Sequence, residues 1–213
     1  GATWRKMWDY AFSISSVLIA LLMGVALGNI ITGIPINAEK EYIGSFLGLL
    51  KPYPIFVGLT TVSLFVMHGA IYAYLKTEGE LQQQIKGWIN NSIITFVILY
   101  VCTTIATLIY YPHMVENFKS APFLAIFPIL NMLAIANIPR MVYHKREGWA
   151  FISSCASIAA LLTIFAIGIF PNLVLSTPNP EYSLNLYNAA SSQKTLQIML
   201  TVALIGMPFV LAY

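Results

Sequence analysis

The sequence predicts an all-α fold, a polytopic membrane helix bundle with six transmembrane helices. The chain of 213 residues is 58% hydrophobic and only 9% charged, with a mean hydropathy of +0.76. Because soluble domains carry about 25% charged residues, this chain lacks the charge for a water-facing surface. Its apolar residues fall in long runs, and about 20 apolar residues in a helix cross a hydrocarbon core of roughly 30 Å. Inside lipid the backbone must bond to itself, which favours helices.

Six apolar spans follow one another and are expected to form a single transmembrane domain over residues 1–213. Their predicted limits are 8–31, 53–75, 88–111, 121–138, 149–173 and 195–213. Pro128 and Pro208 fall inside the fourth and sixth spans. Each proline removes a backbone donor, so both are predicted to kink their helices.

The first span, residues 8–31, carries a helix-packing pattern near its end. No charged residue occurs between Asp9 and Glu39, and Gly24 and Gly28 are four residues apart. Two small residues at this spacing let helix backbones approach closely, so we expect a packing seam there; simple tolerance of glycine in a membrane helix is the alternative. Asp9 is expected in the first turn of the helix, where a carboxylate complements the helix dipole.

Lysine and arginine in the short links predict the orientation, because cytoplasmic loops carry an excess of these residues. The side that holds the first residue carries Arg5, Lys6, Lys76, Lys86, Arg140, Lys145 and Arg146. The opposite side carries Lys40, Lys51, Lys119 and Lys194. The first side is therefore predicted to be cytoplasmic.

The tryptophans support the same orientation. Trp4, Trp8, Trp88 and Trp149 all occur at the starts of odd-numbered spans. Tryptophan is enriched at membrane–water interfaces, so Trp8, Trp88 and Trp149 are predicted to be interfacial anchors in one belt on the cytoplasmic face.

Two links are distinctive. The link of residues 139–148 is interpreted as a positive-inside anchor, with an anionic lipid site as the alternative; its basic residues are Arg140, His144, Lys145 and Arg146. In the link of residues 176–194, Ser183 is predicted to cap a short surface helix with three side chains facing the membrane, Leu184, Leu186 and Tyr187. Ser191 or Ser192 is expected to cap the last span.

Polar residues at membrane depth are costly and therefore candidates for function. His68 lies within the second span and has three interpretations: a buried polar group bonded to a neighbouring helix, a proton relay, or a haem ligand. Four asparagines are expected to form interhelical hydrogen bonds: Asn90, Asn91, Asn131 and Asn137. No catalytic residue or metal ligand is expected, because the other histidines, His113 and His144, fall at different levels from His68. Cys102 and Cys155 are expected to be buried free thiols.

Nucleic acid is not an expected partner, since the net charge is only +3 and no basic run occurs. No nucleotide-binding loop, zinc spacing or serine-elbow motif is present either.

Six short motifs occur in an order that resembles subunit II of the cytochrome bd quinol oxidase family. They are Trp-Arg-Lys-Met-Trp-Asp at 4–9, Gly-Val-Ala-Leu-Gly-Asn at 24–29, Lys-Pro-Tyr at 51–53, His-Gly-Ala-Ile-Tyr at 68–72, Thr-Glu-Gly-Glu-Leu at 77–81, and Ser-Leu-Asn-Leu-Tyr-Asn-Ala-Ala-Ser-Ser at 183–192. Each motif is weak alone, but the ordered set covers nearly the whole chain.

The resemblance implies a nine-helix subunit of which this chain holds the last six helices. The first residue, Gly1, and the apolar run ending at Tyr213 also predict a piece of a longer polypeptide. The resemblance further implies a bacterial or archaeal plasma-membrane enzyme that reduces oxygen to water with quinol. Two b-type haems and haem d are then held by subunit I and none by this chain, and His68 inherits no ligand role.

The resemblance also sets the expected partners. These are subunit I, quinol and lipid, with a small accessory subunit and, as in some members, a structural quinone left open. Residues that bind a cofactor are not identified by the motifs. Two alternatives remain. One is a membrane transporter subunit for a small solute, which the prolines and buried asparagines would suit, and the other is a scaffold without chemistry.

Overall fold

The computed structural model describes residues 2–212 and confirms the all-α class, with six helices long and apolar enough to cross a membrane. The α-helices are α1 (Ala2–Thr32), α2 (Pro52–Lys76), α3 (Gly79–Tyr110), the short α4 (Glu116–Ser120), α5 (Ile126–Tyr143), α6 (Glu147–Ile169) and α7 (Gln193–Ala212). Four 3₁₀ helices lie between them: η1 (Phe46–Leu49), η2 (Pro112–Val115), η3 (Pro122–Ala125) and η4 (Pro180–Tyr182). Two short strands, β1 (Asn172–Val174) and β2 (Leu184–Asn185), pair antiparallel.

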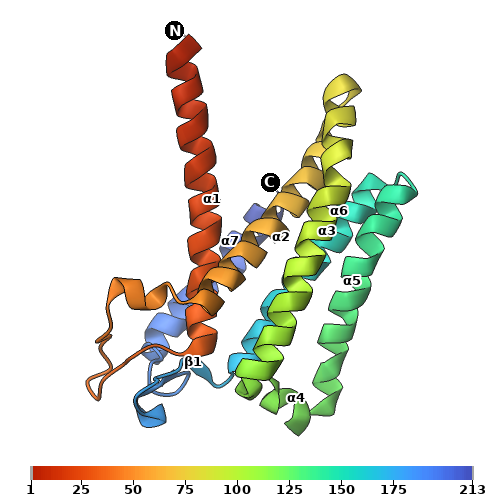
Figure 1. Ribbon diagram of the computed structural model, residues 1–213. Helices are drawn as coiled ribbons and strands as arrows, with labels where there is room; N and C mark the ends of the chain where they lie inside the picture. The colour runs from red at the N-terminus through yellow and green to blue at the C-terminus, as the bar shows by residue number, and fades with distance from the viewer. Residues whose placement is uncertain (1, 213) are drawn as a thin grey trace.

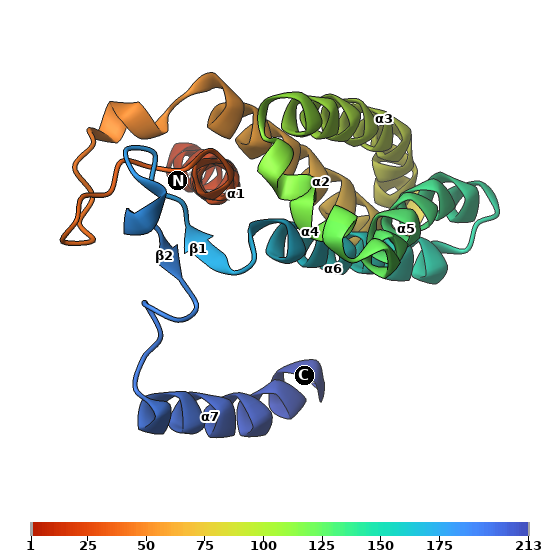
Figure 2. The ribbon, with the colours of Figure 1, turned by 90° about the horizontal axis from the view of Figure 1, so that it is seen from below.

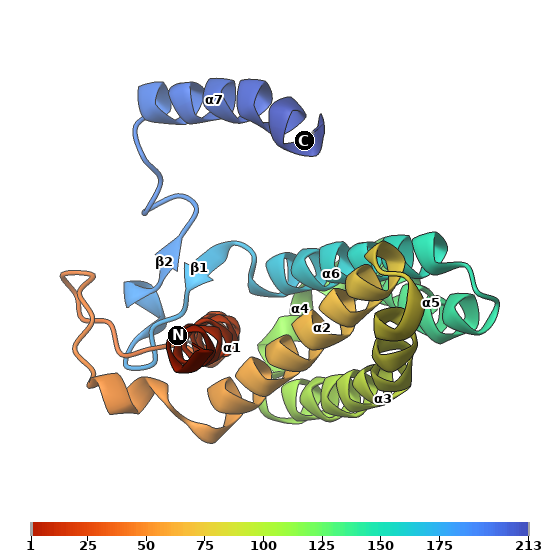
Figure 3. The ribbon, with the colours of Figure 1, turned by 90° about the horizontal axis from the view of Figure 1, so that it is seen from above.

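The long helices alternate in direction, and four of them form one packed group (Figure 1). We call α2, α3, α5 and α6 the four-helix group. Its shared core consists of side chains with little or no exposure, including Met67, Ile71, Ile89, Phe96, Ile138 and Ala150. Helix α1 packs along α2 through its second half only, whereas its first turns extend alone. Helix α7 buries none of its side chains and stands apart from the other helices (Figures 2 and 3).

The observed helix limits differ from the expected spans at several ends. Helix α3 begins at Gly79 rather than Trp88, so most of the predicted inner link is helical. Helix α6 ends at Ile169, and the residues to 173 enter strand β1 because Pro171 has no N–H to continue the helix. The expected end of the last span, Tyr213, lies outside the described residues. Helix α1 begins at Ala2, so the placement of Asp9 in the first turn was wrong.

The proline predictions were half right. Pro128 is the third residue of α5, where the N–H groups have no partner within the helix, so it removes no hydrogen bond there. The proline inside α5 is Pro139, which the sequence analysis placed in the following link. Pro208 does lie inside α7, whose last turn changes direction in Figure 3.

The predicted surface helix at residues 183–187 is wrong, because Ser183 is used differently. Its Oγ accepts the backbone N–H of Ser176 at 3.0 Å, and Leu184–Asn185 then form strand β2. The side chain of Asn185 accepts the N–H groups of Tyr187 and Asn188, both at 2.9 Å, and turns the chain. Ser192 precedes α7, and its Oγ accepts the N–H of Thr195 at 3.4 Å as a long cap.

We call the end of the bundle that holds the start of α1 the inner end and the opposite end the outer end, as labels of position only. The outer ends of the helices are joined through two loops. The N–H of Ile34, which follows α1, donates to the Leu175 carbonyl at 2.9 Å, and the Ile34 carbonyl accepts the N–H of Thr177 at 3.1 Å. The Ser176 hydroxyl donates to the Ile36 carbonyl at 3.0 Å. The Asn117 amide donates to the carbonyls of Ile167 and Phe170, at 2.7 and 2.6 Å, and thereby satisfies the free end of α6. These contacts hold the end of α1 against the α6–α7 connection.

Candidate functional site

The close contact between α1 and α2 is built on three glycines. A Cβ atom at Gly24 would lie 2.6 Å from the Cα of Gly58, and one at Gly28 would lie 2.5 Å from the Cα of Pro54. Real Cβ atoms do not approach other atoms so closely, so any larger side chain would push the helices apart. Gly24 and Gly28 therefore lie directly against the backbone of α2, and a packing role remains our interpretation of both.

His68 forms a hydrogen bond between two helices of the four-helix group. Its Nδ1 lies 2.8 Å from the Oγ of Ser154 on α6, and its ring stacks on Phe151 with centroids 5.0 Å apart. The Ser154 hydroxyl already donates to the Phe151 carbonyl at 2.7 Å. The histidine must therefore donate from Nδ1, which leaves Nε2 as an acceptor on a half-buried ring. A proton relay through His68 stays a prediction.

Asn131 is one of three fully buried polar residues described in the four-helix group, together with Ser154 and Ser157. It is fully buried on α5, donates to the Tyr100 hydroxyl of α3 at 3.0 Å, and accepts from the Ser157 hydroxyl of α6 at 3.1 Å. Asn137 donates to Ser153 of α6 at 2.8 Å. These two asparagines link helices as expected. Asn90 and Asn91 are exposed on α3 and make no side-chain hydrogen bond within residues 2–212, so the expectation of interhelical bonds fails for them there.

A row of paired hydroxyl groups, which we call the hydroxyl seam, joins α2 and α3 and was not predicted from the sequence. The Tyr53 hydroxyl lies 2.7 Å from the Oγ1 of Thr107, and the two Oγ1 atoms of Thr60 and Thr103 lie 2.6 Å apart. Hydroxyl groups in apolar helices are common because each can bond its own backbone. The seam could have been found from the four-residue spacing of Thr103 and Thr107 on one helix face.

Trp8, Trp88 and Trp149 are all exposed, and their helices α1, α3 and α6 begin at the same end of the molecule (Figure 1). Trp4 and Trp8 are in edge contact, with ring centroids 5.7 Å apart. An anchoring role in one interfacial belt remains a prediction. Cys102 and Cys155 are exposed on α3 and α6, so the expectation of buried thiols was wrong.

The histidines do not converge on a common site. His113 Nε2 bonds the Ile31 carbonyl at 3.1 Å at the outer end, whereas His144 contacts the Tyr143 ring beyond the inner end of α5. Among the residues that the structure describes, no group of three or more His, Cys, Asp or Glu could hold a metal ion.

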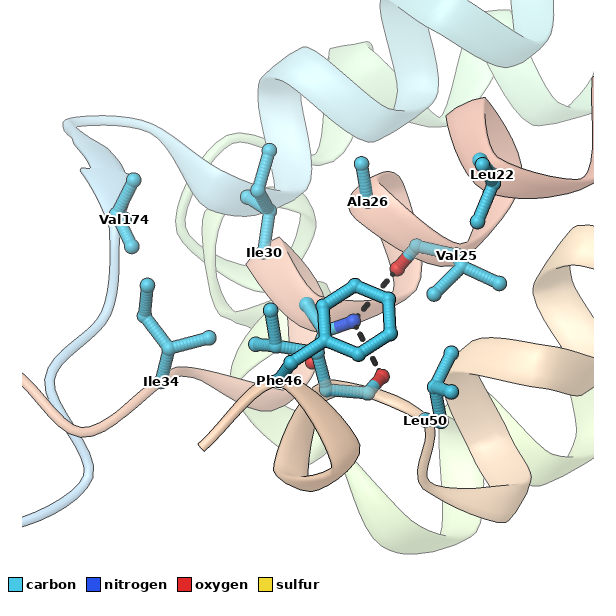
Figure 4. A pocket seen from close by; sticks show the side chains of 10 residues that line it. Leu22, Val25, Ala26, Ile30, Ile34, Phe46, Leu50 and Val174 are labelled. Atoms are coloured by element: carbon cyan, nitrogen blue, oxygen red, sulfur yellow. Dashed lines mark hydrogen bonds between the residues drawn. The ribbon is translucent and has the colours of Figure 1, made fainter. Parts of the chain in front are cut away.

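An apolar pocket of about 300 Å³ lies at the outer end of α1 (Figure 4). Its walls come from α1, η1 and β1, and its one polar side chain is Asn29. The Asn29 amide donates to the carbonyls of Val25 and Leu49 at 2.9 and 2.8 Å, which uses both of its protons. The pocket therefore offers apolar surface and a carbonyl acceptor, but no free amide donor.

A second cavity, of about 350 Å³, lies at the inner end of the α5–α6 pair. It is lined by Arg140, Met141, His144 and Arg146. Three of the four basic residues of the 139–148 link, Arg140, His144 and Arg146, therefore line one cavity.

The chain is similar to several known proteins over its whole length. It is 27% identical over 243 residues to cytochrome bd-I ubiquinol oxidase subunit 2 of Escherichia coli K12, covering 99% of this chain and 63% of that protein. It is 30% identical to the probable cytochrome oxidase subunit 2 of Haemophilus influenzae, covering 99% of this chain and 64% of that protein. The chain thus spans less than two thirds of these relatives.

A solved structure shows the same fold. The structure of bd oxidase from Geobacillus thermodenitrificans superposes with a TM-score of 0.75 at 16% identity, over all of this chain and 65% of that chain. The sequence pattern described as cytochrome bd terminal oxidase subunit II matches residues 1–213. With six membrane-length helices and this match over its entire length, the chain belongs to the cytochrome bd terminal oxidase subunit II family.

Proposed function

We propose that the polypeptide to which this chain belongs is subunit II of a quinol:oxygen oxidoreductase, and that it stabilises a haem-carrying subunit I. The observation that carries this proposal is the family match over residues 1–213 together with the shared helical fold. The relatives in Escherichia coli are named as ubiquinol oxidase subunits. In this role the enzyme is an electrogenic terminal oxidase of aerobic respiration.

The haems supply the oxygen chemistry when bound. Within the described residues no two histidines converge on one site: His68 bonds Ser154 through Nδ1, and His113 bonds the Ile31 carbonyl through Nε2. Following the family resemblance, subunit I is the proposed carrier of two b-type haems and haem d. This chain contributes the exposed apolar faces of α1 and α7, which are suited to lipid and to neighbouring transmembrane helices.

A structural quinone does not fit the apolar pocket through its head group. Quinone carbonyls need hydrogen-bond donors, and both protons of the Asn29 amide are already used. The pocket fits a segment of an apolar chain, such as an isoprenoid tail, along Leu22, Ile30 and Phe46.

We further propose that the first residues lie on the cytoplasmic side. Support comes from the excess of lysine and arginine at that end and from the tryptophan-bearing starts of α1, α3 and α6 (Figure 1). Labelling of single cysteines placed at residues 78 and 181 with a membrane-impermeant thiol reagent, in right-side-out vesicles, tests this. Reaction at 181 but not at 78 is the expected result.

Purification tests the main proposal. A tag on the complete polypeptide should recover subunit I, an absorbance spectrum with b-type and d-type haem bands, and quinol-dependent oxygen consumption. A colourless preparation with a bound small solute would contradict the oxidase and support the transporter alternative.

A further inference from the structure

The inner cavity of the α5–α6 pair is a concentrated basic site. Two guanidinium groups, Arg140 and Arg146, and the imidazole of His144 line it together with Met141. No carboxylate is among the lining residues. Glu147, the next residue along the chain, faces Tyr74 of α2 instead. The cavity therefore has positive charge that none of its own walls neutralise.

The backbone of the turn after α5 explains why Arg140 and Arg146 line the same cavity. The N–H of Lys145 bonds the Val142 carbonyl at 3.1 Å, and the N–H of Arg146 bonds the Met141 carbonyl at 2.9 Å. This pair of bonds is the Schellman motif, and Lys145 occupies its left-handed position with φ of 56°. The chain reverses at Lys145, which brings Arg146 back over the last turn of α5, where Arg140 lies. Lys145 itself is not part of the cavity lining.

Flanking aromatic residues indicate the depth of the cavity in a membrane. Tyr143 is 84% exposed and Trp149 is 59% exposed, and these residue types gather at the level of lipid head groups. Farther along α5, Ile129, Met132 and Leu133 are exposed on a face suited to acyl chains. With the orientation proposed above, these residues put the cavity at the level of the phosphates of the inner leaflet.

We propose that this cavity binds the phosphate group of an anionic phospholipid. The planar guanidinium fork matches two phosphate oxygens, and paired arginines give such recognition both strength and geometry. His144 adds a further donor, held by edge contact of its ring with Tyr143 at 5.5 Å. Met141 provides an apolar wall for the glycerol end of the lipid.

Lipid binding to the delipidated complete complex tests the proposal without reference to oxidase activity. Native mass spectrometry would count retained phosphatidylglycerol and phosphatidylcholine for the unchanged protein and for three single variants, Arg140→Gln, Arg146→Gln and Lys145→Gln. Each removes one positive charge from the same turn. Losing one arginine should weaken phosphatidylglycerol binding about fivefold, whereas Lys145→Gln, outside the cavity, should change it less than twofold. Phosphatidylcholine binding should stay the same throughout.

Three results would overturn the proposal. Equal losses in all three variants would assign the binding to diffuse positive charge. Displacement of phosphatidylglycerol by millimolar inorganic phosphate would make the ligand a free phosphate ion. Full binding in the double variant Arg140→Lys/Arg146→Lys would show that the guanidinium fork is not used, and this variant keeps the charge should the glutamine variants fail to fold.

Discussion

The four-helix group and helix α7 are similarly apolar but differ completely in packing. Side chains of α2, α3, α5 and α6 share one core, whereas α7 buries none of its own. Their polar residues differ as well. Asn131 and Ser154 in the group bond across helices, whereas Thr201 of α7 donates to the Gln197 carbonyl of its own helix. Apolar character therefore predicts that a helix enters the membrane, but not what it packs against. In this chain, polar bonds between helices accompany the packing of the four-helix group, and glycines accompany that of α1 on α2.

The largest expected effect comes from adding one methyl group at the α1–α2 contact. Gly28→Ala and Gly24→Ala should each lower the free energy of unfolding by about 1–3 kcal/mol, because the new Cβ overlaps the backbone of α2. Gly69→Ala is the matched control on α2, since no described atom beyond the neighbouring backbone of α2 lies within 4 Å of its Cβ position. It should be neutral or stabilising by up to about 1 kcal/mol. Thermal unfolding of the complete subunit in detergent measures all three.

The next effect should come from the buried amide. Asn131→Leu leaves the Tyr100 and Ser157 hydroxyls without their partner, and we expect a loss of about 1–2 kcal/mol in the free energy of unfolding. Asn91→Leu on the exposed face of α3 should stay within about 0.5 kcal/mol. An equal loss at both positions would contradict the distinction drawn between buried and outward-facing asparagines.

A smaller effect is expected at His68. His68→Gln keeps a donor for Ser154, so haem content and quinol-oxidase turnover of the complex should both be retained. His68→Leu removes the bond and should cost about 0.6 kcal/mol, the average for polar contacts between membrane helices. Loss of turnover in His68→Gln with intact haem bands would instead support a proton path through this residue.

The smallest effect is expected in α7. Among residues 2–212, no atom beyond the neighbouring backbone of α7 lies within 4 Å of a Cβ at Gly206, so Gly206→Ala should change the free energy of unfolding by less than about 0.5 kcal/mol. A strong destabilisation by Gly206→Ala would contradict this expectation. It would show that α7 packs on a neighbour beyond residues 2–212.

Much of the fold followed from the sequence because hydropathy reports burial from water. The six spans and the alternation of helix direction needed no other information. Hydropathy does not separate a protein interior from lipid, however, and this is why Cys102, Cys155 and Asn91 were expected inside and lie outside. For each of these residues the predicted helix is present, but the residue lies on its exposed face rather than on its packed face.

Local turns and the candidate sites were predicted less well, because their partners are remote in sequence. Serine is a common helix cap, but the hydroxyl oxygen of Ser183 accepts the backbone N–H of Ser176, and the residues that follow form a strand. The glycine spacing at 24 and 28 pointed to a close helix contact, whereas Gly58 and Pro54, which complete that contact, gave no pattern of their own. The basic link was found, but the turn that folds Arg146 back toward Arg140 depends on one left-handed residue.

The pairing of Thr60 with Thr103 has a consequence for where hydrogens reside. Each hydroxyl is also within reach of a carbonyl of its own helix, Phe56 for Thr60 at 2.9 Å and Leu99 for Thr103 at 2.7 Å. The two hydroxyl protons cannot fill all three contacts. One threonine therefore donates to the hydroxyl of the other, and the second donates to the carbonyl of its own helix. The two choices are mirror versions of each other, as in the proton disorder of ice. The interface between α2 and α3 thus holds its heavy atoms in one arrangement that two arrangements of hydrogens can satisfy. Valine at either position would remove the bond across the helices and leave the remaining threonine donating only to its own helix.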